Sequence, residues 1–268
     1  MKFFFLITLL VISSCASNKE TPEKEVCFML FNLHENRFEE VENKKQCESR
    51  LPAASTFKVP LSVMAFDAGF LKSETEPLFK WNGKYNSITA WNGDQTPKSW
   101  MKESVVWVSQ EITPKLGMDK MIDYLTNFSY GNEDMTGGLT TAWLTPTPSN
   151  QTFQNSLKIS GYEQISFWKK LWHGELKVKS EAQLMTIKLL PEERSKNGSV
   201  MMGKTGSGFV NADFTRRVGW YVAFLEVKKS DYIVLTNFID LKDQPAGVYG
   251  GREAKEMTMK FLEKRGLW

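Results

Sequence analysis

The order of apolar patterns along the chain constrains its fold more than any other feature. Strand-type segments rich in Val, Phe, Tyr and Trp lie towards both ends, at 26–31, 199–204, 217–227 and 232–238. Segments with apolar residues at helical spacing lie mainly between them, at 56–70, 104–112, 116–128, 165–172, 182–190 and 251–262. The pattern predicts an α+β fold, in which strands from both chain ends form an antiparallel sheet flanked by helices. A helical subdomain over roughly 75–190 would fill the middle of the chain.

The first residues, 1–14, resemble a secretory signal peptide. Lys2 is followed by an apolar run over 3–12, which is too short to cross a bilayer as a helix. The run ends in small residues before Cys15, as in a bacterial lipoprotein processing site, where Cys15 would become the lipidated first residue. The alternative is ordinary cleavage near Ala16. We expect export to the periplasm, with membrane attachment only through this lipid.

Residues 15–24 are polar and predict a short tether, and residues 25–268 predict a single domain. The rest of the chain contains no long linker, low-complexity run or internal repeat. Cys27 and Cys47 lie within the domain, and export permits a disulfide between them. Two separate buried thiols are the alternative, and the sequence leaves both open.

Charge and metal-binding residue types exclude two broad functions. Lys plus Arg number 34 and Asp plus Glu 31, so the formal net charge is only +3, and no basic stripe suggests a nucleic-acid partner. The two histidines and three cysteines show no recognisable zinc-ligand spacing. We therefore expect no metal and no nucleic-acid binding.

Ser55-Thr56-Phe57-Lys58 opens the first long predicted helix. Ser55 and Lys58 would share one helical face, where a lysine with a lowered pKa can accept the serine proton. The helix N-terminus favours a developing oxyanion. The same spacing at Ser99 to Lys102 and Ser166 to Lys169 predicts only surface pairs, and a plain helix cap is the alternative at Ser55.

Four further motifs follow the first one in order: Ser104-Val105-Val106, Tyr130-Gly131-Asn132, Trp143-Leu144 and Lys204-Thr205-Gly206. Together the five motifs resemble the class D serine β-lactamases, the oxacillinase group of the penicillin-recognising serine enzymes. The resemblance extends from about residue 27 to 261. It implies a β-lactamase/transpeptidase-like fold and hydrolysis of a small-molecule β-lactam through a serine acyl-enzyme, which confers β-lactam resistance.

The resemblance also implies catalytic roles. Ser55 would be the nucleophile, and Lys58 would be carbamylated by carbon dioxide or bicarbonate to an N6-carboxylysine that acts as general base. Ser104 would pass a proton to the departing lactam nitrogen, helped by Lys204. Carbon dioxide is the only added chemistry implied, and no other cofactor.

Six more residues are implied in substrate binding. The resemblance implies that Val106 is the apolar side chain beside the base, that the Trp143 indole donates to the carbamate, and that Thr205 is a hydroxyl donor. The Ser207 N–H would form the oxyanion hole together with that of Ser55. Arg252 would bind the substrate carboxylate, and Gly206 would belong to the binding site as part of the Lys204-Thr205-Gly206 motif. A core tryptophan and a solvated arginine are the alternatives at Trp143 and Arg252, and residues 130–132 predict mainly a structural turn lining the site.

The chain departs from the family pattern after Trp143-Leu144, where residues 145–155 intervene. We interpret them as a longer loop at the rim of the pocket. The insertion leaves open the exact placement of Trp143. Shortening the loop is expected to change the relative rates on different β-lactams while Ser55 is still acylated, and loss of all acylation in a folded variant would contradict this.

Three rival functions share parts of the pattern. A penicillin-sensing receptor domain would stay acylated, and a D,D-peptidase or transpeptidase usually has S-x-N where this chain has Ser104-Val105-Val106. A structural lipoprotein would keep the motifs as relics. The sequence leaves the choice between a monomer and a homodimer open.

Overall fold

The computed structural model describes residues 23–144, 156–211, 213–228, 230–244 and 249–268. The predicted signal 1–14, Cys15, nearly all of the tether and the loop 145–155 therefore lie outside the described residues. Within the described ranges, no helix is long and apolar enough to cross a membrane.

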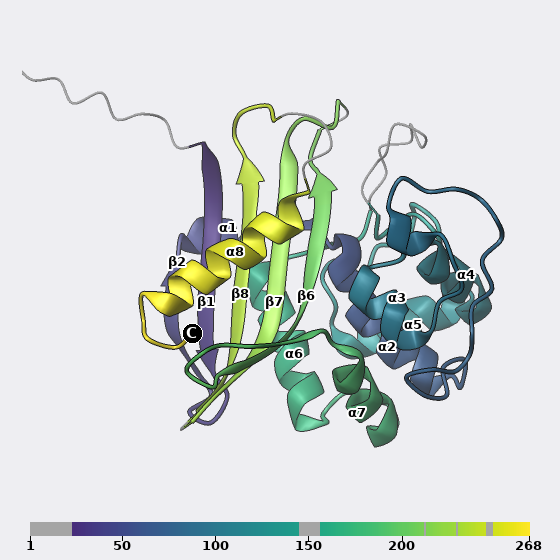
Figure 1. Ribbon diagram of the computed structural model, residues 1–268, viewed down its shortest axis with the longest axis horizontal. Helices are drawn as coiled ribbons and strands as arrows, with labels where there is room; N and C mark the ends of the chain where they lie inside the picture. The colour runs from purple at the N-terminus through teal and green to yellow at the C-terminus, as the bar shows by residue number, and fades with distance from the viewer. Residues whose placement is uncertain (1–22, 145–155, 212, 229, 245–248) are drawn as a thin grey trace, which may run out of the picture.

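A six-stranded antiparallel sheet forms the centre of the fold (Figure 1). Its strands run in the order β2-β1-β8-β7-β6-β5, with bounds Arg37–Glu42, Lys24–Asn32, Ser230–Asp240, Arg217–Val227, Val200–Phe209 and Glu192–Arg194. The first strand pairs with the last, with Val26 opposite Phe238 and Leu30 opposite Val234. This pairing confirms the predicted α+β sheet built from both ends of the chain.

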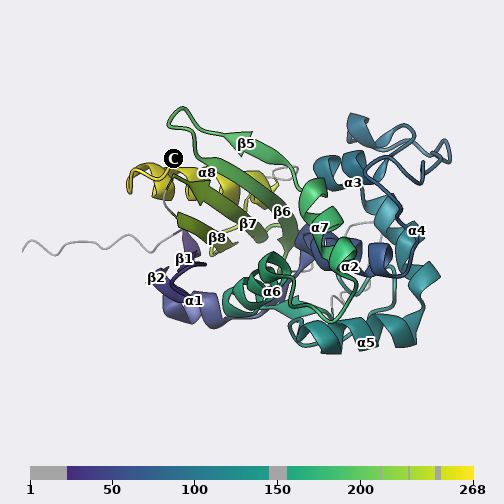
Figure 2. The same cartoon turned by 90° about the horizontal axis from the view of Figure 1, so that it is seen from below.

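Both faces of the sheet are covered by helices (Figure 2). Phe28, Tyr221 and Leu225 belong to the apolar cluster that includes Ala254 and Leu262 of α8 (Gly250–Glu263). Side chains of alternate strand residues point to the opposite face and join a larger core beneath α6 (Gly161–His173) and α1 (Lys44–Glu48). The central strands are therefore apolar on both faces, which explains their continuous Val, Phe, Tyr and Trp content.

The remaining helices lie beside the β6 edge of the sheet (Figure 1). They are α2 (Lys58–Asp67), α3 (Pro97–Glu103), α4 (Val106–Leu116), α5 (Met118–Phe128) and α7 (Ser180–Leu189), with short 3-10 turns η1 (Ala54–Phe57) and η2 (Thr89–Trp91). A two-stranded ladder of β3 (Leu51–Pro52) and β4 (Lys158–Ile159) lies apart from the main sheet. Residues 58–66 of α2 are all buried, so this helix forms the centre of the helical region.

The helical region differs in detail from the predicted elements. Ser104 ends α3, and α4 begins at Val106, so the predicted helix over 104–112 starts two residues late. The region also includes α2, while α6 packs against the sheet, so it does not coincide with the predicted span of 75–190. Hydrophobic spacing reports that a helix buries a face, but it does not report which layer the helix packs against.

Cys27 and Cys47 form a disulfide that joins β1 to α1. Both cysteines are fully buried. The structure thus resolves the two alternatives in favour of the pair. The bond fastens the first strand of the sheet to the short helix that precedes β3 and η1.

A buried ion cluster fastens the start of α8 to the sheet. The fully buried Asp240 carboxylate accepts hydrogen bonds from Arg217 at 2.6 Å and Lys24 at 2.9 Å. Glu253, in the first turn of α8, lies 2.9 Å from Arg217 and 3.3 Å from Lys24. Charges from β1, β7, β8 and α8 are therefore paired in one place, which positions the first turn of α8 beside β6.

Candidate active site

The Ser-Thr-Phe-Lys motif lies where the sheet meets the helical region. Ser55 belongs to η1, which runs directly into α2 at Lys58. Ala54, just before it, has a φ of 48°, a left-handed conformation that costs energy for a residue other than glycine. The Nζ atom of Lys58 lies 3.2 Å from the Ser55 Oγ. The structure therefore brings the predicted nucleophile and base within hydrogen-bonding distance.

Lys58 is completely buried. Burial lowers the pKa of its amine well below the usual range, and the nearby charge of Lys204 lowers this pKa further. The Lys58 Nζ atom also lies 5.4 Å from the centre of the Trp143 ring. The lowered pKa favours the neutral amine, which is the form that can accept a proton or react with carbon dioxide.

Ser104 and Lys204 form the second polar pair of the site. The Nζ atom of Lys204 lies 3.0 Å from the Ser104 Oγ and donates a second hydrogen bond, also 3.0 Å, to the Thr205 carbonyl. Ser104 adopts a left-handed backbone conformation, with φ of 60°, at the end of α3. Burial, and then the charge of Lys255, lower the pKa of Lys204 to about 7. Lys204 can therefore exchange a proton near neutral pH.

The edge of β6 supplies backbone donors next to η1. β5 pairs only with residues 200–202, so the edge beyond them lies open. The Gly203 N–H points away from β7 and donates to the Pro191 carbonyl. The Val210 N–H points the other way and donates to the Arg216 carbonyl, next to β7. Because N–H directions alternate along a strand, the N–H groups of Thr205 and Ser207 also point to the open edge. The predicted oxyanion donor of Ser207 thus faces the cleft that Ser55 lines.

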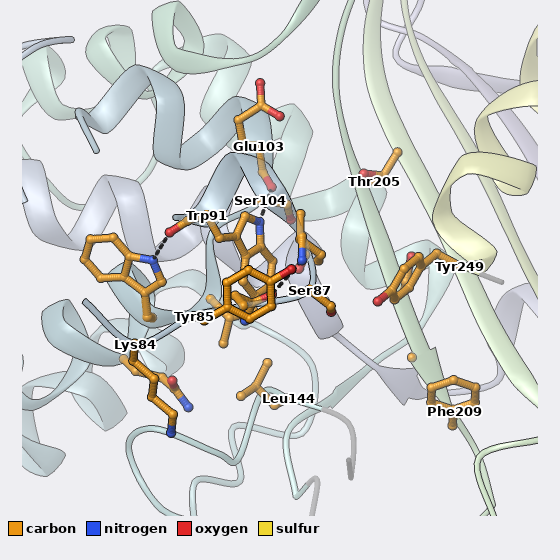
Figure 3. A pocket seen from close by; sticks show the side chains of 18 of the residues that line it. Lys84, Tyr85, Ser87, Trp91, Glu103, Ser104, Leu144, Thr205, Phe209 and Tyr249 are labelled. Carbon is orange, nitrogen blue, oxygen red and sulfur yellow. Dashed lines mark hydrogen bonds between the residues drawn. The ribbon is translucent and has the colours of Figure 1, made fainter. Parts of the chain in front are cut away.

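A cleft of about 810 Å³ opens above these groups and is lined by Ser55, Ser104, Val106, Thr205 and Ser207. Aromatic side chains line both sides of the cleft. Tyr85 and Trp91 lie on the helical side, and Phe209 and Tyr249 lie on the sheet side (Figure 3). Trp107 of α4 also lines the helical side. The indole N–H groups of Trp91 and Trp107 donate to the carbonyls of Glu103 and Trp91, which holds the helical wall together.

The sequence analysis did not identify four members of this aromatic rim, Tyr85, Trp91, Phe209 and Tyr249. The signal for Tyr85 and Trp91 is the polar segment 81–91, which contains Trp and Tyr and shows neither helical nor strand periodicity. Phe209 ends β6, and Tyr249 precedes α8. They meet the helical wall only because the fold brings these segments together.

Trp143 lies beside Lys58 as the resemblance implied, but its N–H is engaged elsewhere. The residue is fully buried, its ring stacks on Phe57 with centroids 5.7 Å apart, and its N–H donates to the Leu139 carbonyl at 3.2 Å. Leu144, the next residue, lines the cleft. Donation from the Trp143 indole to a carbamate on Lys58 stays a prediction.

Arg252 lies at the molecular surface rather than in the cleft. Its side chain is 87% exposed and pairs with Glu256 at 3.1 Å, one helical turn further along α8. Its neighbour Gly251 donates its N–H to the Ser207 Oγ at 2.9 Å. The helix therefore touches the site through its backbone, and the predicted carboxylate-binding role of Arg252 stays a prediction.

The turn at 130–132 holds the β4 strand and does not line the cleft. Asn132 accepts a hydrogen bond from the Lys158 N–H and donates to the Ser156 carbonyl. Gly131 has a φ of 63°, and a Cβ there would lie 2.1 Å from the Lys158 carbonyl oxygen, so only glycine fits. These bonds agree with the structural part of the prediction for this turn.

The two other serine-lysine repeats lie outside this site. Ser99 forms a capping box with Thr96 at the start of α3, and Ser166 is exposed on α6. Across the described residues, no group of three or more His, Cys, Asp or Glu side chains could hold a metal ion.

Comparisons with known proteins agree with this arrangement. The family described as the penicillin binding protein transpeptidase domain matches residues 16–263. The β-lactamase OXA-1 of Escherichia coli is 37% identical over 243 residues, which cover 85% of this chain and 83% of OXA-1.

Solved structures of similar proteins share the fold. A class D β-lactamase from Bacillus subtilis superimposes with a TM-score of 0.77 at 29% identity, covering 91% of this chain and 93% of that one. The C-terminal domain of the Bacillus licheniformis BlaR penicillin receptor superimposes with a TM-score of 0.79 at 27% identity, covering 92% of each chain.

Proposed function

The chain belongs to the class D β-lactamases, within the penicillin binding protein transpeptidase domain family, and from this membership we propose how its own residues hydrolyse the β-lactam amide. One observation carries the proposal: a completely buried lysine with a lowered pKa lies 3.2 Å from a serine hydroxyl. A neutral lysine at this distance can take the proton of Ser55 as its oxygen attacks the lactam carbonyl.

The surroundings of Lys58 fit a carbamate on its amine. Burial lowers the pKa of the amine and so favours the neutral form, which carbon dioxide requires, and the indole of Trp143 lies beside it. When bound, the carbamate supplies oxygen atoms that act as the general base. Carbon dioxide or bicarbonate is the only addition that we propose, and the roles of the surrounding residues do not depend on a metal.

Acylation opens the four-membered ring. The Ser55 oxygen bonds to the lactam carbonyl carbon, the carbon–nitrogen bond breaks, and the nitrogen takes a proton through Ser104 and Lys204, which lie 3.0 Å apart. The N–H groups of Ser55 and Ser207 stabilise the oxyanion. Because its pKa is about 7, Lys204 can release and recover this proton near neutral pH.

Deacylation adds one water molecule to the ester. Before this step Lys58 returns the proton that it took from Ser55 to the solvent, and Lys204 recovers one from the solvent. The Lys58 side chain then takes a proton from the water, whose oxygen bonds to the carbonyl carbon, and passes this proton to the Ser55 oxygen as that oxygen leaves. Val106, at the cleft wall, limits the access of further water. The product is the ring-opened β-amino acid, and Ser55 and Lys58 return to their initial state.

The substrate carboxylate binds at the β6 edge in this proposal. Lys204 supplies positive charge there, and the Thr205 hydroxyl, which lines the cleft, donates a hydrogen bond. Gly206 lets the strand lie against η1, since a Cβ there would be 3.0 Å from the Thr56 methyl. Arg252 is paired with Glu256 in the structure, so it can bind the substrate carboxylate only when this ion pair breaks. The substitution Arg252→Ala tests this role.

We further propose that the protein is exported, that residues 1–14 are removed, and that it confers β-lactam resistance from the periplasm. The disulfide between Cys27 and Cys47 supports an oxidising compartment. Lipidation of Cys15 is proposed from the sequence around it alone, and mass spectrometry of the protein isolated from membranes would test it.

Turnover of a chromogenic cephalosporin tests the proposed function. Wild type, Ser55→Ala and Lys58→Ala are compared at neutral pH with and without bicarbonate. We expect multiple turnovers that require both residues and rise with bicarbonate, because both steps need the Ser55–Lys58 pair. Activity that is independent of bicarbonate at every pH would refute the carbamate.

The other outcomes identify the rival functions. A single stoichiometric burst would place this chain with penicillin receptors such as the BlaR domain, which shares the fold. Release of D-alanine from a peptidoglycan peptide would indicate a peptidase. If the folded wild-type chain neither forms an acyl-enzyme nor hydrolyses the β-lactam, the remaining explanation is a structural lipoprotein.

A further inference from the structure

Thr56, next to the nucleophile, is held by a residue from a distant helix. Its fully buried hydroxyl donates to the Ala53 carbonyl at 2.5 Å, which closes the turn of η1. The same hydroxyl accepts a hydrogen bond of 2.9 Å from the side-chain amide of Gln164 on α6. The conformation of the segment that carries Ser55 is therefore linked to α6, 108 residues further along the chain.

Gln164 is fully buried, and its only side-chain hydrogen bond within the described chain is the one to Thr56. Its amide oxygen has no partner there, and burying such a group without a hydrogen bond costs free energy. A methionine or leucine would fill this position in α6 without that cost. The amide therefore serves the contact with η1 rather than the stability of its own helix.

A third buried group, the Tyr130 hydroxyl, lies beside these two. It faces Thr56 and Gln164 without a hydrogen bond of good geometry to either one. Burial raises the pKa of Tyr130, so that its hydroxyl stays protonated and can donate. Residues 56, 130 and 164 thus form a small polar cluster inside an apolar core, directly beneath Ser55.

The opposite side of Thr56 rests on β6. A Cβ at Gly206 would lie 3.0 Å from the Thr56 methyl and 3.3 Å from its backbone nitrogen. Thr56 is thus wedged between α6 and the strand that carries Lys204 and the oxyanion donor of Ser207. A small shift of Thr56 would move Ser55 relative to Lys58 and to the β6 edge together.

We propose that Gln164 is a positioning residue for acylation: its amide, through the Thr56 hydroxyl, sets the orientation of η1 and therefore of the Ser55 oxygen. The proposal rests on the proposed function, because it concerns the attack of that oxygen. Reacting groups must be held within a fraction of an ångström, and a misplacement of about 1 Å can cost about 100-fold in rate.

The test compares Gln164→Met with a matched control, Gln183→Met. Gln183 is a buried glutamine on α7, and its amide bonds to backbone groups of Leu176 and Gly174, which do not belong to η1. The single-turnover rate of Ser55 labelling by a fluorescent penicillin is measured, with the melting temperature of each variant. We expect Gln164→Met to be about 10- to 100-fold slower and Gln183→Met to match wild type.

Thr56 variants separate positioning from general loss of stability. Thr56→Val removes both the bond to the Ala53 carbonyl and the bond from Gln164, so it should slow labelling at least as much as Gln164→Met, while Thr56→Ser keeps most of the rate. The double variant Thr56→Val/Gln164→Met should be no slower than Thr56→Val alone, since that substitution already removes the hydrogen bond between the two residues. Equal slowing of Gln183→Met, or an additive double variant, would overturn the proposal.

Amide hydrogen exchange of residues 53–57 gives a readout that does not need activity. We expect about tenfold faster exchange in Gln164→Met and no change in Gln183→Met. If wild type fails to hydrolyse but still labels, the proposed hydrolysis fails and the positioning role stands. If labelling and exchange are both unchanged in Gln164→Met, the positioning role fails and hydrolysis stands.

Discussion

Two buried lysines, Lys58 and Lys204, dominate the electrostatics of the cleft. Neither forms an ion pair with a carboxylate of the described chain, and burial lowers the pKa of both. A buried amine without a counter-ion destabilises a fold, because its charged form loses hydration. Their presence in the core is therefore explained by chemistry rather than by stability.

Replacing Lys58 by methionine should stabilise the protein while abolishing turnover. In bicarbonate-free buffer, where Lys58 carries no carbamate, burial lowers the pKa of folded Lys58, whereas unfolded Lys58 is charged below a pKa of about 10.4. The burial of Lys58 therefore costs no stability above a pH of about 10.4, and this cost grows as the pH falls towards the lowered pKa of the folded state. We expect Lys58→Met to gain about 1–2 kcal/mol in the free energy of unfolding at neutral pH, and less at pH 10.

Denaturant unfolding of both proteins across this pH range measures the effect. Lys255→Met is the control, since Lys255 is paired with Glu193 and should show no gain. A Lys58→Met variant that is less stable than wild type at neutral pH would contradict the neutral, unpaired amine.

The KM for an anionic β-lactam should rise as pH increases through about 7. Lys204 has a pKa of about 7, so it is charged below this pH and neutral above it. If its charge attracts the substrate carboxylate, KM grows by up to about tenfold per pH unit on the alkaline side. Steady-state kinetics from pH 5.5 to 9 would measure this rise.

Lys204→Arg serves as the comparison for that profile. Arginine stays charged across this range, so KM should become independent of pH while kcat falls, because arginine cannot exchange the proton. A wild-type KM that stays constant from pH 6 to 9 would rule out the charge of Lys204 as the carboxylate partner.

At the scale of elements, the site is the meeting of η1, the end of α3 and the open edge of β6. Each supplies a group in an unusual backbone setting: Ala54 and Ser104 have positive φ, and the N–H groups of Thr205 and Ser207 at the β6 edge have no backbone partner among the described residues. Such strain is tolerated where neighbouring elements overdetermine it. Here α2 beneath η1, α6 beneath Thr56 and α8 beside Ser207 do so.

Gly131→Ala should destabilise the helical region by about 2 kcal/mol or more. The turn needs a φ of 63°, and the new Cβ would lie 2.1 Å from the Lys158 carbonyl oxygen, so β4 must move as well. Gly174→Ala is the control, because it has a similar φ of 69° with no atom within 4 Å of a new Cβ. It should cost about 1 kcal/mol.

Thermal unfolding of the two glycine variants separates the cost of a positive φ, which both positions share, from the cost of the Cβ contact with Lys158, which only Gly131→Ala creates. Equal destabilisation by both substitutions would mean that the 130–132 turn does not clamp β4. A larger loss in Gly131→Ala, together with altered amide exchange at 156–159, is the expected result.

For the whole molecule, closure of the sheet by β1 and β8 joins the two ends of the chain. The disulfide from β1 to α1 and the buried charges around Asp240 secure this closure from two sides. Although burial opposes it, hydrogen bonds from Arg217 and Lys24 hold the pKa of Asp240 below its usual range. The ionised Asp240 cluster therefore stabilises the fold at any pH above the usual pKa of an aspartate, and this contribution is lost as the pH falls through the lowered pKa.

Removing the disulfide should lower stability without changing the chemistry. Cys27 and Cys47 are 20 residues apart, and closing such a loop contributes about 3 kcal/mol. The double variant Cys27→Ala/Cys47→Ala should lose about 2–4 kcal/mol in the free energy of unfolding, with kcat unchanged below its lowered melting temperature. Treatment of wild type with dithiothreitol under mild denaturation should give the same loss, and an unchanged melting temperature in both tests would contradict the contribution.

The sequence by itself determined the fold class and the main polar groups of the site. Alternating and helical apolar patterns depend on local burial, so they predicted a sheet from both chain ends and a helical middle. The resemblance of five ordered short motifs to the class D β-lactamases identified Ser55, Lys58, Ser104 and Lys204, because each motif is short enough to be found in the sequence itself. The structure brings these four together in pairs of 3.2 and 3.0 Å.

Only the tertiary structure decided which residues are buried together and which stay outside. It paired Cys27 with Cys47, placed Arg252 on Glu256, assembled the aromatic rim and linked Gln164 to Thr56. The lowered pKa of Lys58 likewise arises from packing by distant segments. Local sequence patterns carry no information on such contacts, because distances and burial between remote segments are set only when the layers of the fold pack.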